Sequence, residues 1–132
     1  HVLRGAWRPR VLAAGPLLQW RGVLGFSGIP TIFEDIWLPA TPFKGLSVAQ
    51  LSAHPGAMYS LFESVFGVRM VRAEERIKAV SPDPAACELL EVSADTPLLS
   101  VERVAYTYNN APMELRRALY RTDTHHYKNE LN

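Results

Sequence analysis

Two long stretches of alternating apolar and polar residues constrain this chain more than any other feature. Residues 17–26 read LLQWRGVLGF, which places every second side chain on one apolar side, as in a half-buried strand. After a turn at Ser27-Gly28-Ile29-Pro30, the run TIFEDIWL is rich in β-branched and aromatic residues and predicts a returning strand. We therefore expect one β-hairpin over residues 17–38.

The same arrangement recurs near the C-terminus, where PLLSVERVAYTY and PMELRRALYRTD flank Asn109-Asn110. These segments predict a second hairpin, because Asn tolerates the positive φ that such turns require. Pro16 precedes the first hairpin as Pro97 precedes the second, and Pro30 and Pro112 open the returning strands at nearly the same spacing. The sequence thus predicts a duplicated β-hairpin unit.

The segment between the hairpins predicts two helices, a long strand and a third helix, at residues 48–52, 57–66, 68–80 and 85–92. Hairpins separated by helices favour an α+β domain, with an antiparallel sheet of about six strands and helices on one face. Residues 16–132 form this domain. Residues 1–15 fit neither periodicity and are interpreted as a truncated N-terminal arm or linker.

Composition argues against several classes of function. The net charge of +1 over 132 residues lacks the basic excess typical of nucleic-acid binders. The single cysteine, Cys87, argues against internal disulfides and multi-cysteine zinc sites, so we expect a metal-free and cofactor-free domain in the reducing cytoplasm. No apolar run approaches the roughly 20 residues of a membrane span. The chain begins with His1 and not Met, which indicates a piece of a larger product.

Charged residues on otherwise apolar strand faces are the strongest functional signal. They are Glu34, Glu75, Arg103 and Glu114, and Tyr120 shares the face of Glu114. Burying an unpaired charge costs several kcal/mol, so these groups need polar partners. Two interpretations stay open: an internal salt-bridge network that only joins strands, or a ligand cavity lined by carboxylates, an arginine and a tyrosine. Four such residues on neighbouring strands favour the cavity.

The sequence does not favour catalysis. None of its serines lies in a G-x-S-x-G turn, and no histidine lies close in sequence to a candidate nucleophile. The glycines of GVLGFSG do not lead into a helix, which argues against a dinucleotide-binding loop. We therefore do not expect an enzyme.

The succession GIPTIFEDIWLP, FKGL, MYSLFESVFGVRMVRAEERIKAV and LLEVSADTPLLSVERVAYTYNNAPMELRRALYRTDTHHYKNEL resembles the UTRA effector-binding domain of GntR-type (HutC-subfamily) bacterial transcription regulators. The resemblance covers residues 16–132. It implies a chorismate-lyase-like fold, no catalysis, a small-molecule effector and a homodimer. It also implies that operator DNA is bound by an N-terminal winged helix-turn-helix, which this chain lacks.

The resemblance also implies an effector site. It assigns effector contacts to Glu34, to Glu114 in the last hairpin and to Tyr120. Relatives that sense sugar phosphates carry an Arg-x-Arg pair where this chain has Gly22 and Leu24, and a serine where Ala57 precedes Met58-Tyr59. Loss of these anion donors disfavours a phosphorylated sugar.

We expect a neutral or cationic, partly apolar effector. The predicted cavity has an apolar wall that is open at Gly22. Three carboxylates lie across from this wall, Glu34, Glu75 and Glu114, and Arg103 is the one clear cation beside them. Two alternatives from other classes are a chorismate-lyase-like enzyme and a purely structural dimerisation domain. For the homodimer, Phe33, Trp37 and Leu119 are expected to form an exposed apolar face on the opposite side of the sheet.

Overall fold

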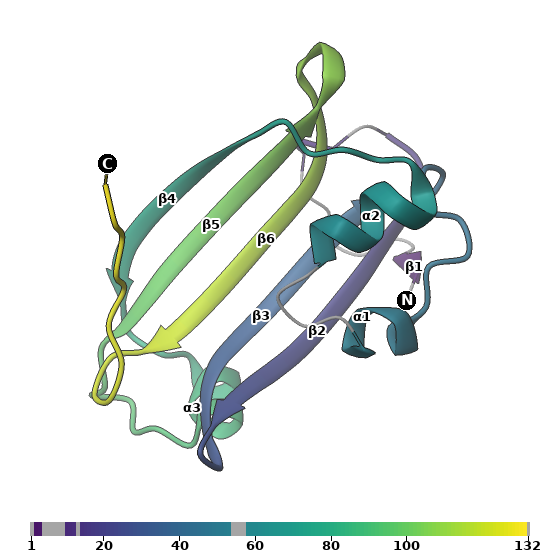
Figure 1. Ribbon diagram of the computed structural model, residues 1–132. Coiled ribbons are helices and arrows are strands. Elements are labelled where there is room, and N and C mark those ends of the chain that lie inside the picture. Colours follow the sequence, from purple (N-terminus) through teal and green to yellow (C-terminus); the bar gives the residue numbers. More distant parts are fainter. Residues whose placement is uncertain (1, 4–9, 13, 54–57, 132) are drawn as a thin grey trace.

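Six strands form one antiparallel sheet in the order β1-β2-β3-β6-β5-β4 (Figure 1). The computed structural model describes residues 2–3, 10–12, 14–53 and 58–131. The strands are β1 (Val2–Leu3), β2 (Leu17–Phe26), β3 (Ile29–Pro39), β4 (Arg72–Val80), β5 (Leu98–Thr107) and β6 (Ala111–Arg121). Both predicted hairpins are confirmed as β2–β3 and β5–β6, and they meet where Ile32 of β3 lies opposite Tyr120 of β6.

Two consecutive residues with positive φ close each hairpin. Ser27 and Gly28 have φ values of 53° and 78° in the first turn, and Asn109 and Asn110 have values of 60° and 57° in the second. This left-handed backbone matches the right-handed twist of the paired strands. The expectation for the Asn109-Asn110 turn is therefore confirmed.

Three α-helices accompany the sheet: α1 (Val48–Ala53), α2 (Met58–Phe66) and α3 (Pro84–Leu90). A short 3-10 segment, η1 (Tyr108–Asn110), lies in the second turn. Helix α3 begins at a cap in which the Asp83 carboxylate accepts a 2.8 Å hydrogen bond from the backbone N–H of Ala86. The predicted long strand is shorter than expected, since β4 begins at Arg72.

Helices α1 and α2 cover the β2–β3 half of one sheet face (Figure 1). Their buried side chains join Ile36 and Leu38 of β3 in the main core, where the rings of Phe43 and Phe62 lie 4.7 Å apart between centroids. Helix α2 also reaches β6 through Tyr59 and Met58, whereas β4 and β5 are left largely open on the same face. A hollow can therefore form where the two halves meet.

The expectation of helices on one face holds only for α1 and α2, because α3 packs on the opposite face. There its buried Ala86 and Leu90 contact Phe33 of β3 and Leu98 of β5. Strand alternation gives the face of each side chain but not the element that covers that face. For that reason the sequence did not predict which face of the sheet α3 covers.

The exposed apolar face predicted for a dimer partner is wrong. Phe33 is 7% exposed beneath α3, and Trp37 is 4% exposed in a cluster with Leu12 and Leu115. Leu119 is half-buried and packs against the cluster that contains Phe33. The chain's own α3 and the residue Leu12 cover the surface that had been assigned to a second copy.

Candidate functional site

A cavity of about 560 Å³ lies between the sheet and helices α1 and α2. This volume falls in the range of small-molecule sites. The side chains that line it come from β2, β3, α1, α2, β5 and β6: Trp20, Val23, Leu24, Ile32, Glu34, Leu51, Ser52, Met58, Tyr59, Ser60, Arg103, Arg116 and Tyr120. Five of the predicted site residues are thus brought together: Leu24, Glu34, Tyr59, Arg103 and Tyr120.

The sheet register explains why residues far apart in sequence meet here. One row across the sheet joins Trp20, Ile36, Arg116, Arg103 and Glu75, each opposite the next on a neighbouring strand. The adjacent row on the same face begins with Gly22 and Glu34. Because side chains alternate between faces, both rows point toward α1 and α2.

Arg103 and Arg116 lie directly opposite each other on β5 and β6, an arrangement that would be repulsive alone. Each arginine has its own carboxylate partner. Arg103 Nη2 lies 3.0 Å from Glu75 Oε2, and Arg116 Nη2 lies 3.1 Å from Glu114 Oε2. The predicted residues Glu75 and Glu114 therefore act as partners of the arginines, behind the side chains that line the cavity.

Glu114 is the most buried charged group of the site, with no exposed surface. Its Oε1 accepts a 2.7 Å hydrogen bond from the hydroxyl of Tyr59 on α2, and its Oε2 accepts the bond from Arg116. Burial, followed by the negative charge of Glu114, raises the pKa of Tyr59 to about 12. The hydroxyl thus stays protonated and donates at physiological pH.

Glu34 is 7% exposed, yet within the described part of the chain no hydrogen bond or ion pair reaches its carboxylate. Burial raises the pKa of Glu34 above its usual range, while the nearby positive charge of Arg116 acts in the opposite direction. The guanidinium of Arg116 also lines the cavity, and because its described hydrogen bonds to Glu114 and Met58 both use Nη2, its Nη1 is a donor without a described partner. The cavity therefore holds one acceptor and one donor in need of partners.

Arg116 is the functional residue that the sequence analysis missed. It lies two positions after Glu114 on β6, so the same alternation that selected Glu114 and Tyr120 places it on their face. The expected charge balance, with Arg103 as the only cation, is wrong for this reason. With both arginines paired to carboxylates, the remaining negative charge belongs to Glu34.

The wall at Gly22 is apolar as predicted but is not open. A Cβ atom at Gly22 would lie 2.3 Å from Cη2 of Trp20, so the indole lies directly across this glycine. Side-chain carbons essentially never approach so closely. Trp20 therefore fills the space above Gly22. The remaining predicted position, Ala57, lies outside the described residues.

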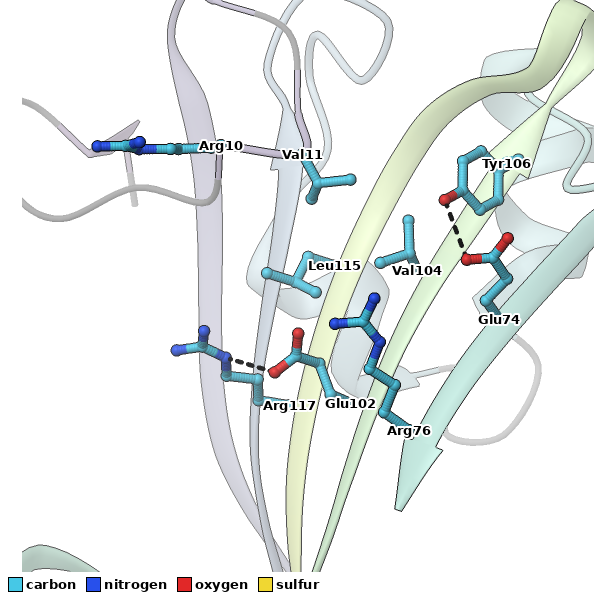
Figure 2. Close-up of a pocket in the computed structure, with 9 residues that line it drawn as sticks. All are labelled: Arg10, Val11, Glu74, Arg76, Glu102, Val104, Tyr106, Leu115 and Arg117. Carbon is cyan, nitrogen blue, oxygen red and sulfur yellow. Dashed lines mark hydrogen bonds and ion pairs between the residues drawn. The ribbon is translucent and has the colours of Figure 1, made fainter. Parts of the chain in front are cut away.

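A second, smaller cavity of about 240 Å³ lies on the opposite sheet face (Figure 2). Its charged side chains largely bond to one another. Arg117 Nε donates to Glu102 over 3.3 Å, and the Tyr106 hydroxyl lies 3.5 Å from a Glu74 oxygen. Figure 2 also shows Arg10 pointing away from the other side chains. The polar groups of this cavity already bond to one another, so they offer a ligand fewer unpartnered groups than Glu34 and Arg116 do.

Neither a metal centre nor a membrane-spanning helix is found among the described residues. No cluster of three or more His, Cys, Asp or Glu side chains is arranged to hold a metal ion. No helix among these residues is both long enough and apolar enough to cross a lipid bilayer.

Comparisons with known proteins agree on one family. The UTRA domain family matches residues 11–126. The ligand-binding domain of a GntR-family transcriptional regulator from Bordetella bronchiseptica is 46% identical, with a TM-score of 0.82 over 93% of this chain and 80% of that one. The crystal structure of PhnF from Mycobacterium smegmatis has a TM-score of 0.75 and 28% identity over 89% of this chain and 51% of that one.

A curated relative gives the same result from sequence alone. The HTH-type transcriptional repressor PhnF of Mycolicibacterium smegmatis is 32% identical over 108 residues, which are 82% of this chain and 43% of the repressor. The chain thus spans less than half the length of this relative. The fold, the cavity and the family match together show that the chain belongs to the UTRA domains, the ligand-binding domains of GntR-family transcription regulators.

Proposed function

We propose that this chain binds a small organic effector in the cavity between the sheet and helices α1 and α2. The observation that carries the proposal is that two polar groups line this cavity without described hydrogen-bond partners, the Glu34 carboxylate and Nη1 of the Arg116 guanidinium. A hydrogen bond to a charged group contributes about 1.5–3 kcal/mol. A bound molecule that supplies both partners is stabilised by these bonds.

We further propose that effector binding controls operator DNA through a helix-turn-helix domain joined to this chain in the intact regulator. The curated relative is named an HTH-type repressor and is more than twice the length of the matched segment. An effector that favours one of two domain arrangements would change the spacing of the DNA-binding heads. Such a regulator acts in the cytoplasm, as a homodimer on two-fold repeated operators.

The alternatives receive less support. A purely structural domain would fill its interior, whereas about 560 Å³ lies beside Glu34 and Tyr120. A chorismate-lyase-like enzyme is suggested by the shared fold alone, and fold does not determine function. Pyruvate release on incubation with chorismate would nevertheless favour the enzyme.

The test is a thermal-shift screen of the chain against amino acids, aromatic acids, sugars and amines, with calorimetry of each hit. A hit should lose its shift in Tyr120→Ala, which alters the cavity, and keep it in Tyr106→Ala on the opposite face. The same hit should change the operator affinity of the intact regulator in fluorescence anisotropy. A screen without ligands, together with an unresponsive operator affinity, would contradict the proposal.

A further inference from the structure

The two unpartnered groups of the cavity have opposite hydrogen-bonding character. The Glu34 carboxylate accepts, and Nη1 of the Arg116 guanidinium donates, since the described bonds of Arg116 use Nη2. They are not ion-paired with each other, because the Arg116 guanidinium pairs with Glu114 at 3.1 Å. A ligand that satisfies both groups must therefore present a donor and an acceptor side by side.

The sheet register places these groups close together. Ile36 lies opposite Arg116, and Glu34 lies opposite Ala118, so Glu34 and Arg116 are diagonal neighbours on β3 and β6. Diagonal neighbours on adjacent strands are roughly 7–8 Å apart at the backbone. One compact planar head group can reach both side chains.

A flat apolar surface adjoins this pair. Gly22 lies opposite Glu34 on the neighbouring strand, and the Trp20 indole covers Gly22. Leu24 and Ile32 extend the apolar wall beside it. An aromatic side chain in this position favours packing against a planar ring of the ligand.

Charged head groups satisfy only half of the site. A carboxylate accepts from Arg116 but is repelled by Glu34, and a phosphate dianion is repelled more strongly. An ammonium group pairs with Glu34 but leaves Nη1 of Arg116 without an acceptor. A neutral amide supplies the N–H and the C=O together.

We propose that the effector, in the site of the proposed function, is a neutral planar molecule with an amide-type donor–acceptor head. This class comprises aromatic carboxamides, lactams and cyclic ureides. The head lies between Glu34 and Arg116, and the ring lies against Trp20. Arg116 and the Trp20–Gly22 contact thus act as specificity determinants of this domain.

Four probes with the same ring test the head group: benzamide, benzoate, benzylamine and phenyl phosphate. Each is titrated against the isotope-labelled chain at pH 7.5, and dissociation constants are taken from NMR shift changes. Benzamide should bind at least about tenfold more tightly than each charged probe, since each of those leaves Glu34 or Arg116 without a hydrogen bond or is repelled by one of them. The largest shifts should come from residues that line the cavity.

Variants then separate the two contacts. Glu34→Gln keeps a carbonyl acceptor, so benzamide affinity should change by less than about threefold while benzylamine binding weakens and benzoate binding improves. Arg116→Gln should weaken benzamide by about tenfold. Asp35→Asn and Arg117→Gln alter the neighbouring positions on the opposite face and should leave all four affinities unchanged.

Tighter binding of benzoate, benzylamine or phenyl phosphate in the cavity overturns this inference and leaves the proposed function standing. The absence of benzamide binding at 10 mM also overturns it, and the wider ligand screen then decides the proposed function separately. If Arg116→Gln does not fold, Glu34→Gln alone decides the outcome, because in that variant benzylamine binding should weaken and benzoate binding should improve. If Glu34→Gln and Asp35→Asn change the preference for benzamide over the charged probes by the same amount, the result contradicts the assigned site.

Discussion

The Tyr59 hydroxyl donates a 2.7 Å hydrogen bond to the fully buried carboxylate of Glu114, which joins helix α2 to strand β6. This contact spans the boundary between the helix-covered half of the sheet and the open half. It also fixes the ring of Tyr59 at the cavity wall, near the guanidinium of Arg116. A single interaction thus supports both the fold and the shape of the site.

Removing this hydroxyl should destabilise the domain. We expect Tyr59→Phe to lower the free energy of unfolding by about 1–3 kcal/mol, because one oxygen of a buried carboxylate then lacks its donor. Urea denaturation followed by circular dichroism measures the loss. Tyr106→Phe is the control, since its hydroxyl lies 3.5 Å from exposed Glu74, and its effect should stay within about 0.5 kcal/mol. Equal losses in both variants would contradict the buried hydrogen bond.

Alkaline pH should remove the contribution of Tyr59. Its pKa is about 12 in the folded chain and about 10 when unfolded, so the unfolded state loses the proton first. The stabilisation is therefore fully present below pH 10 and is lost as pH rises toward 12. Urea titrations from pH 9 to 11 should show a steeper decline for wild type than for Tyr59→Phe, by up to about 1.4 kcal/mol per pH unit. Parallel pH profiles would show that the hydroxyl is not held as described.

The contact between Trp20 and Gly22 gives a third prediction. Gly22→Ala introduces a methyl group where the indole lies, so the ring must move, at a cost of about 1–3 kcal/mol and with a shift in tryptophan fluorescence. In a Trp20→Ala background the same substitution should cost under about 0.5 kcal/mol, because the obstacle is gone. Equal costs in both backgrounds would mean that the indole does not occupy this space.

Alternation along the strands was sufficient to predict much of the fold and of the site. It placed Glu34, Arg103 and Tyr120 on one face, because the side-chain period of a strand is a local property that sequence displays directly. The same rule, applied fully to β6, would have found Arg116. The sequence therefore contains the signal for Arg116 as well.

Other features depend on tertiary packing and have no local signal. The alternation places Phe33 and Trp37 on a sheet face that was predicted to be exposed. In the structure α3 covers Phe33, and Leu12 packs against Trp37. Likewise, the sequence gives Gly22 as an open position, and only the side-chain conformation of Trp20 closes it. Contacts between elements far apart in the chain decide both cases.

The last prediction concerns assembly, which now requires a different surface from the one expected. Strand β4 lies at the sheet edge, its residues Arg72–Ala79 are all exposed, and Ile77 is 46% exposed. An unpaired edge strand of this length is suited to pairing with a second copy. Light scattering should therefore give twice the 14.8 kDa chain mass at micromolar concentration. Ile77→Lys should shift the chain toward monomer, whereas Val65→Lys on the exposed side of α2 should not. A wild-type monomer, or a dimer equally sensitive to both variants, would contradict pairing through β4.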